Sequence, residues 1–212
     1  MQPITVLRGR RSAFRLGASL VAVCAVALPG PAEAQASPQN LRPVRDVAVT
    51  YDVRVGQRPA RQVPVSWQAA TQRVRAEPPG LPGWILVALP EGRAQMVMDA
   101  AGMVVDLPAG DMAPFLGGVP PGTRLIRQGE ATIAGQRCTD WRVTRKDGEG
   151  TVCLTTDGVV LRAEGRHKGQ EGRIEALTVS YATQPDGRFS VPAGYRPLAL
   201  PPALLSGLLG GG

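Results

Sequence analysis

Histidine, cysteine and closely spaced carboxylates are the residues with which this sequence could perform chemistry, and they are few. The 212 residues contain one histidine, His167, which excludes a metal site built from several histidines and leaves a Ser-His-Asp triad a single candidate base. His167 lies in a polar stretch between Arg166 and Lys168, whose positive charges disfavour protonation of its ring. A solvated turn residue is therefore a better interpretation of His167 than a catalytic base.

The acidic and glycine residues predict no catalytic site either. Asp140 and Asp157 lie near two cysteines, but nothing around them would raise the pKa of either carboxyl group, so a strand-surface acid and a turn acid are the simpler interpretations. The stretch 116–118 lacks the strand-loop-helix context and the Lys-Ser/Thr end of a phosphate-binding loop, and no Gly-x-Ser-x-Gly elbow follows the first 36 residues. We therefore expect no enzyme, no cofactor and no metal site.

The first 36 residues have the layout of a secretory signal peptide. An apolar run over residues 16–28 is followed by Pro-Gly-Pro and small residues, and it is preceded by Arg8, Arg10, Arg11 and Arg15. The run is shorter than the roughly 20 residues of a membrane span. We expect export to the periplasm with cleavage after Ala34 or Ala36, and no transmembrane span in the mature chain. The secretory and the twin-arginine routes both stay open.

Cys138 and Cys153 remain once the leader, with Cys24, is removed, and an even pair in an exported chain predicts a disulfide. Closing a loop of about 15 residues stabilises a fold by roughly 3 kcal/mol in the chain-entropy treatment. The segment between the cysteines is typical of a hairpin. Its tip is either Asp147-Gly148, favoured by turn chemistry, or Arg145-Lys146, which would place the cysteines directly opposite each other.

The charge of the chain does not favour nucleic-acid binding. The formal net charge is +7, and removing the leader leaves 20 basic and 16 acidic side chains, a net charge of +4. The remaining arginines are scattered among acids, with no run of five like charges.

Alternating apolar residues predict a series of short strands. The alternation is clearest over residues 47–55 and 63–69, and the second strand is expected to continue to residue 77. Further strands are expected at residues 84–89, 93–98, 103–107, 123–130, 131–144, 151–155, 158–165 and 172–183. Residues 108–122 contain four prolines and four glycines, which predicts a loop or a short helical turn.

These elements predict a mainly β fold: a single curved antiparallel sheet, or half-barrel, of about ten strands with little helix. Such a sheet must be covered or must curl, since its apolar face cannot stay flat and open. The expected organisation is a signal peptide at 1–36, a flexible lead-in at 37–45, the sheet domain at 46–197 and an apolar, Gly-ended tail at 198–212. The tail is expected to plug the sheet, to touch a membrane or to be disordered.

Three segments carry a resemblance to a known family. Residues 133–141 (Ile-Ala-Gly-Gln-Arg-Cys-Thr-Asp-Trp), 153–162 (Cys-Leu-Thr-Thr-Asp-Gly-Val-Val-Leu-Arg) and 189–195 (Phe-Ser-Val-Pro-Ala-Gly-Tyr) resemble a proteobacterial family of exported proteins of unknown function. More distantly, the strand and turn pattern is similar to the curved sheets of LolA and LolB. The resemblance implies a LolA-like half-barrel around an apolar cavity that holds acyl chains, and it implies that residues 189–195 form the last strand and exit.

We therefore expect a non-catalytic protein that binds a lipid, a lipid-modified protein or another apolar ligand. Flexible methionines and aromatic rings suit such contacts, so the candidate lining residues are Trp67, Trp84, Met96, Met98, Met103, Met112, Phe115 and Trp141. For any one of them, ordinary core packing is the simpler interpretation. The alternative function is a structural or protein-interaction module of the cell envelope. The sequence does not predict the oligomeric state or the ligand.

Overall fold

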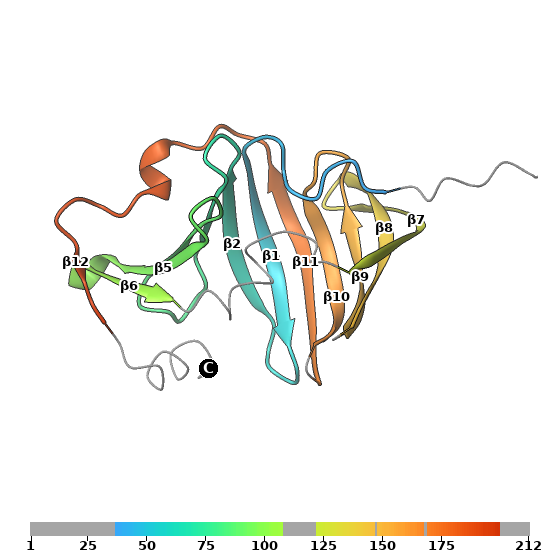
Figure 1. Ribbon diagram of the computed structural model, residues 1–212, viewed down its shortest axis with the longest axis horizontal. Helices are drawn as coiled ribbons and strands as arrows, with labels where there is room; N and C mark the ends of the chain where they lie inside the picture. The colour runs from blue at the N-terminus through green and yellow to red at the C-terminus, as the bar shows by residue number, and fades with distance from the viewer. Residues whose placement is uncertain (1–36, 108–121, 147, 168, 200–212) are drawn as a thin grey trace, which may run out of the picture. The chain divides into compact units, whose positions relative to one another are not determined.

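The chain forms twelve strands and two short 3-10 turns in the part that the structure, a computed structural model, describes: residues 37–107, 122–146, 148–167 and 169–199 (Figure 1). The first six strands are β1 (Val47–Val55), β2 (Arg61–Gln68), β3 (Arg73–Ala76), β4 (Trp84–Ala88), β5 (Arg93–Met98) and β6 (Met103–Leu107). The others are β7 (Arg124–Ile133), β8 (Gln136–Arg145), β9 (Gly148–Leu154), β10 (Val160–His167), β11 (Gln170–Ser180) and β12 (Arg196–Pro197). The turns are η1 (Asp99–Ala101) and η2 (Asp186–Phe189). Among these residues, no helix has the length and hydropathy to cross a membrane.

All twelve strands belong to one sheet, in the order β12-β6-β5-β4-β3-β2-β1-β11-β10-β9-β8-β7. β1 lies between β2 and β11, so one meander extends from β1 to β6 and another from β7 to β11 (Figure 1). Neighbouring strands run antiparallel, except that the short β12 runs parallel to β6. The prediction of a single curved, mainly β sheet with little helix is confirmed, with twelve strands instead of about ten.

The segment expected as one long strand up to residue 77 is two strands. β2 ends at Gln68, the chain reverses, and β3 returns antiparallel to β2. Gln72 in this reversal has a φ of 50°, in the left-handed region that glycine usually fills. The prediction was wrong here because neither glycine nor proline marks the turn in the sequence.

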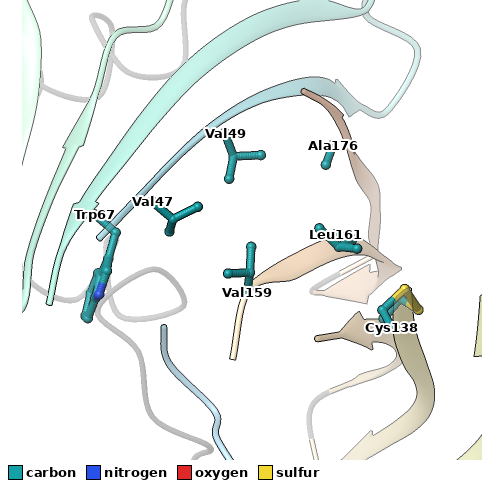
Figure 2. Packing of buried hydrophobic residues seen from close by; sticks show 8 residues of the cluster. Val47, Val49, Trp67, Cys138, Val159, Leu161 and Ala176 are labelled. Carbon is teal, nitrogen blue, oxygen red and sulfur yellow. A yellow bond between two sulfur atoms is a disulfide. The ribbon is translucent and has the colours of Figure 1, made fainter. Parts of the chain in front are cut away.

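Alternation along the strands gives the sheet two faces, and we call the inner face the one that carries Val47, Val49 and Val53 of β1. Figure 2 shows Val47, Val49, Ala176 and Leu161 pointing into a common interior. The buried cluster to which Val47 and Val49 belong also contains Trp67, Cys138, Cys153, Val159, Leu161 and Ala176. A second buried cluster on β4 to β6 consists of Ile85, Val87, Ala94, Met96, Val105 and Leu107. Val74 and Leu89 contact both clusters, so they join the two cores.

Residues 184–195, which we call the strap, cover the opposite, outer face of β4 and β5. Phe189 at the end of η2 is fully buried against Trp84, Leu86 and Val97. Polar contacts fasten the strap to the sheet: the Gln68 side chain donates to the Gln184 carbonyl and to Asp186, and Arg73 donates to the Phe189 carbonyl. The segment 189–195 is therefore not the last strand that the resemblance implied, because Phe189 inserts into the core and β12 follows it.

The lead-in that the sequence predicts to be flexible makes specific contacts in the structure. The Val44 amide donates to the Asp157 carbonyl, and the Arg45 guanidinium pairs with the Asp157 carboxylate at 2.8 Å. Arg45 also stacks 3.6 Å above the ring of Tyr181. Gly158 is essential to this approach, since a Cβ there would stand 2.0 Å from the Arg42 carbonyl oxygen.

Cys138 and Cys153 form the expected disulfide, with a Cα–Cα distance of 5.4 Å. Arg145 of β8 pairs with Gly148 of β9, so the hairpin register lies between the two alternatives that the sequence left open. Cys153 therefore stands opposite Asp140, two residues from Cys138, and the disulfide joins the strands diagonally.

Candidate functional site

The inner face carries an unbroken apolar row across five adjacent strands. Each residue of the row stands directly opposite the next one in the sheet, and we call the set the central row: Val53, Ile174, Ala163, Val152 and Trp141. Four of these side chains are half-buried and Trp141 is buried. Arginines end the row on both sides, since Arg61 is opposite Val53 and Arg127 is opposite Trp141.

A row of small residues lies beside the central row. In register across β1, β11, β10, β9 and β8 it consists of Val55, Gly172, Gly165, Gly150 and Val143. The glycines leave bare backbone at three consecutive strands, which lets the sheet bend sharply. β7 returns to within 8 Å of β11 between Cα atoms, although three strands separate the two in the sheet. The inner face is thus both apolar and strongly curved at this end.

The inner face continues over the other meander as a second apolar row. It crosses β1 to β6 through Val49, Val65, Ala76, Ile85, Met96 and Val105, each opposite the next. Val65 and Ala76 are half-buried, whereas Ile85, Met96 and Val105 are buried in the second cluster. The half-buried apolar residues of the two rows therefore lie on β3, β2, β1, β11, β10 and β9.

The candidate lining residues do not share one surface. Trp67 belongs to the first inner cluster, Met96 to the second, and Met98 packs against the second from its half-buried place opposite Met103. Trp84 lies on the outer face, under the strap, so its indole points away from the inner face. Trp141 ends the central row. Met112 and Phe115 lie outside the described residues.

The sequence reasoning missed the smaller members of the central row. Val53, Ile174, Ala163 and Val152 are ordinary strand residues, and their residue types do not distinguish a binding surface from a core, whereas methionines and aromatic rings suit contacts with an apolar ligand. The apolar side of each strand was readable from its alternation. The row itself was not, because it depends on the register of four strand pairs.

The electrostatics around the central row are dominated by arginine. On the outer side, Arg54 pairs with Asp52 and Arg173 pairs with Glu175 at 2.7 Å. At the Trp141 end, Arg127 pairs with Glu130. Arg61 makes no hydrogen bond or ion pair with any residue that the structure describes. The two ends of the row therefore differ in charge.

The titratable groups near the inner face have structural roles. Burial raises the pKa of the Tyr51 phenol, whose hydroxyl donates to the Val160 carbonyl at 2.8 Å and so ties β1 to β10. In the described part of the chain, no three His, Cys, Asp or Glu residues gather as metal ligands.

Described residues line two surface hollows near the sheet. One, of about 1010 Å³, is lined by the small glycine residues of β9 to β11 and by charged side chains that include Arg142, Glu164 and Arg173. The other, of about 660 Å³, lies between residues 38–44 and the end of β2, with Trp67 and Ala69 in its wall. Trp67 is 7% exposed, and its indole nitrogen is buried with no hydrogen-bond partner in the described structure.

Comparisons of the sequence and the fold with known proteins agree only on architecture. No protein-family model and no curated protein matches the sequence. Among solved structures, the fold is similar to an uncharacterised conserved protein of Thermus thermophilus, with a TM-score of 0.50 and 13% identity over 74% of this chain and 91% of that one. It is also similar to MucB, with a TM-score of 0.50 and 15% identity over 72% of this chain and 59% of MucB.

A LolA superfamily protein of Nitrosomonas europaea also matches, with a TM-score of 0.41 and 10% identity over 72% of this chain and 94% of that one. The chain spans less than two thirds of MucB, which is seen in complex with MucA in a structure of the Pseudomonas aeruginosa pair. At these identities the likeness concerns the fold alone. At that level, the fold implied by the resemblance is similar to the folds of the two structures that match with a TM-score of 0.50.

Proposed function

We propose that the protein is exported to the periplasm and binds a lipid or another apolar ligand on the inner face of its sheet, without catalysis. One observation carries the proposal: the central row presents half-buried valine, isoleucine and alanine side chains on adjacent strands, with no charged residue between Arg61 and Arg127. Burying an acyl chain there gains about 0.8 kcal/mol per methylene group, which needs no catalytic or metal chemistry.

The fold supports this proposal in a second way. An open, curved sheet leaves one apolar face accessible, and contiguous apolar surface on a folded domain marks a site for an apolar ligand or partner. The N-terminal basic and apolar segments, with small residues at 34 and 36, support export and cleavage. The tail at 198–212 lies largely outside the described residues, and its role as a plug is part of the proposal.

The test compares two substitutions on β11, one on each face. Ile174→Asp places a charge in the central row, whereas Thr178→Asp places the same charge opposite Thr50 at an exposed position on the outer face. The probe is N-phenyl-1-naphthylamine, a neutral dye whose fluorescence rises in apolar surroundings. We expect the wild type and Thr178→Asp to bind it, and Ile174→Asp to bind at least tenfold more weakly while keeping its circular dichroism spectrum.

Two results would contradict the proposal. Equal binding by the two variants would remove the central row as the site. A wild-type protein that binds no dye, and that shows no lipid mass by native mass spectrometry after gentle purification from a periplasmic extract, would remove apolar ligand binding altogether.

A protein-interaction module of the envelope is the second candidate, and one observation favours it. β7 is a ten-residue strand at the end of the sheet, and among the described residues only β8 is hydrogen-bonded to it as a neighbouring strand. Such an edge can accept an extended segment of another protein by strand addition. The variant Ile126→Pro tests this, because it removes a backbone amide from β7. If the variant loses a crosslinked partner protein while its dye binding is unchanged, the result would favour the interaction module.

A further inference from the structure

Arg61 lies at one end of the central row. On its strand, β2, every second side chain points to the inner face: Arg61, Val63, Val65 and Trp67. Arg61 therefore lies on the same side of the sheet as the valines. Arg61 stands directly opposite Val53, the first residue of the central row, and its side chain is exposed. A chain lying along the row therefore reaches a guanidinium at this end.

The charge of Arg61 is not compensated by the residues that the structure describes. Arg127, at the other end of the row, is neutralised by Glu130, and nearby Arg54 is paired with Asp52. No carboxylate or other acceptor of the described residues binds Arg61. Among the described residues, the row thus has one cationic end and one end where the arginine is paired with a carboxylate, which gives a bound amphiphile a direction.

We propose that the ligand is an anionic amphiphile whose head group pairs with Arg61 and whose acyl chain runs along the central row toward Trp141. This rests on the proposed function. A guanidinium binds a carboxylate or a phosphate through two parallel hydrogen bonds, and it offers nothing comparable to a neutral alcohol. From β2 to β8 the row crosses five strand spacings, about 24 Å at 4.8 Å each, which suits a long acyl chain.

The experiment measures displacement of N-phenyl-1-naphthylamine by three ligands with the same C16 chain. Palmitate carries a carboxylate, palmitoyl-lysophosphatidylglycerol carries a phosphodiester, and monopalmitoylglycerol is neutral. We expect at least one of the two anions to displace the dye from the wild type at a concentration at least tenfold lower than the neutral ligand. The better anion identifies the head-group chemistry, and the preference should weaken as salt screens the charge.

Arg61→Gln and Arg124→Gln are the matched variants. Arg124 is also exposed and without a partner among the described residues, but it lies on β7, away from the central row. Arg61→Gln is expected to reduce the anion preference to twofold or less while leaving dye binding and the neutral ligand unchanged, and Arg124→Gln is expected to keep the preference.

The outcomes separate this inference from the function on which it rests. Equal displacement by all three ligands, or a preference that survives Arg61→Gln, would overturn the role of Arg61 and leave apolar binding intact. A wild-type protein that binds neither the dye nor any of the three ligands would instead refute the proposed function.

Discussion

Gly150 and Gly165 stand directly opposite each other on β9 and β10, so close that a Cβ on Gly150 would lie 2.3 Å from the Glu164 carbonyl oxygen and 3.0 Å from the Cα of Gly165. Both atoms belong to the backbone, so no side chain can move aside. The pair shows why the sheet can bend at this row: the strands approach each other where no Cβ separates them.

The glycine row predicts a sharp contrast between two alanine substitutions. Gly150→Ala should lower the free energy of unfolding by about 1–3 kcal/mol through overpacking. Gly172→Ala, in the same row, should leave it unchanged or raise it by a few tenths, because the only atom near its Cβ is 3.9 Å away. Urea unfolding followed by circular dichroism measures both. Equal losses would show that curvature does not depend on the Gly150–Gly165 approach.

The two buried tryptophans at 67 and 84 predict different responses to removal of the indole N–H. The Trp84 indole donates to Asp99 at 3.0 Å, and Arg75 stacks 3.9 Å above its ring, whereas the Trp67 indole nitrogen has no partner in the described structure. Trp84→Phe should therefore destabilise more than Trp67→Phe, by about 1–3 kcal/mol. Thermal and urea unfolding of the two variants decide the order, and a larger loss for Trp67→Phe would contradict it.

The disulfide predicts a redox-dependent stability. Cys138→Ala combined with Cys153→Ala should reduce the free energy of unfolding by about 3 kcal/mol, since the bond closes a loop with a sequence separation of 15. A phosphine reductant should destabilise the wild type to a similar degree once both thiols are freed. The double variant serves as the control, because the reductant should leave its unfolding curve unchanged.

Asp157 predicts a loss of stability in acid. Burial opposes ionisation of its carboxyl group, but hydrogen bonds from Thr155 and Arg45, with the charge of Arg45, outweigh burial and hold the pKa below its usual value. A carboxyl whose pKa is lower in the folded state stabilises the fold above the unfolded pKa of about 3.9, and the stabilisation is lost as pH falls through the folded value.

The matching experiment compares wild type with Asp157→Asn from pH 7 to pH 2. We expect the wild-type free energy of unfolding to decline more steeply below about pH 4 than that of the variant, with the two curves converging in acid. Parallel curves over the whole range would mean that Asp157 adds nothing to the acid sensitivity. The Arg45 side chain of this ion pair is exposed to solvent. Added salt should therefore reduce the stability difference between wild type and Asp157→Asn by a small but measurable amount.

Strand periodicity was sufficient to predict the kind of fold from the sequence. Val47 to Val55 alternates cleanly because one side of β1 is core, and Gly or Asp-Gly turns mark most strand ends. The reversal at Gln72 could not be predicted, because a glutamine, and not a glycine, has the left-handed backbone conformation there. The strap could not be predicted either, because Phe189 is fully buried by contacts with β4 and β5, about a hundred residues earlier in the chain. Local pattern carries no information about such distant contacts.

The candidate site was only partly predictable for the same reason. Trp141 is part of the central row, but Trp84, chosen on equal chemical grounds, faces outward. β4 is buried on both faces, so its continuous apolar run gives no sign of which face is inner. The register shifts at Thr50/Tyr51 and Val160/Arg162 also change which side chains share a row, and a bulge leaves no clear mark in a sequence.

The pairing of β1 with β11 has a consequence for how the chain folds. Ala48 meets Ser180, while the other strands from β1 to β11 pair with sequence neighbours, so each meander can form from local hairpins. Joining the meanders requires closure of a loop that contains nearly all the intervening chain, and such non-local pairing is slow. We therefore expect β1 and β11 to pair after the two meanders have formed. Until then β1 is expected to be an open edge, which favours aggregation.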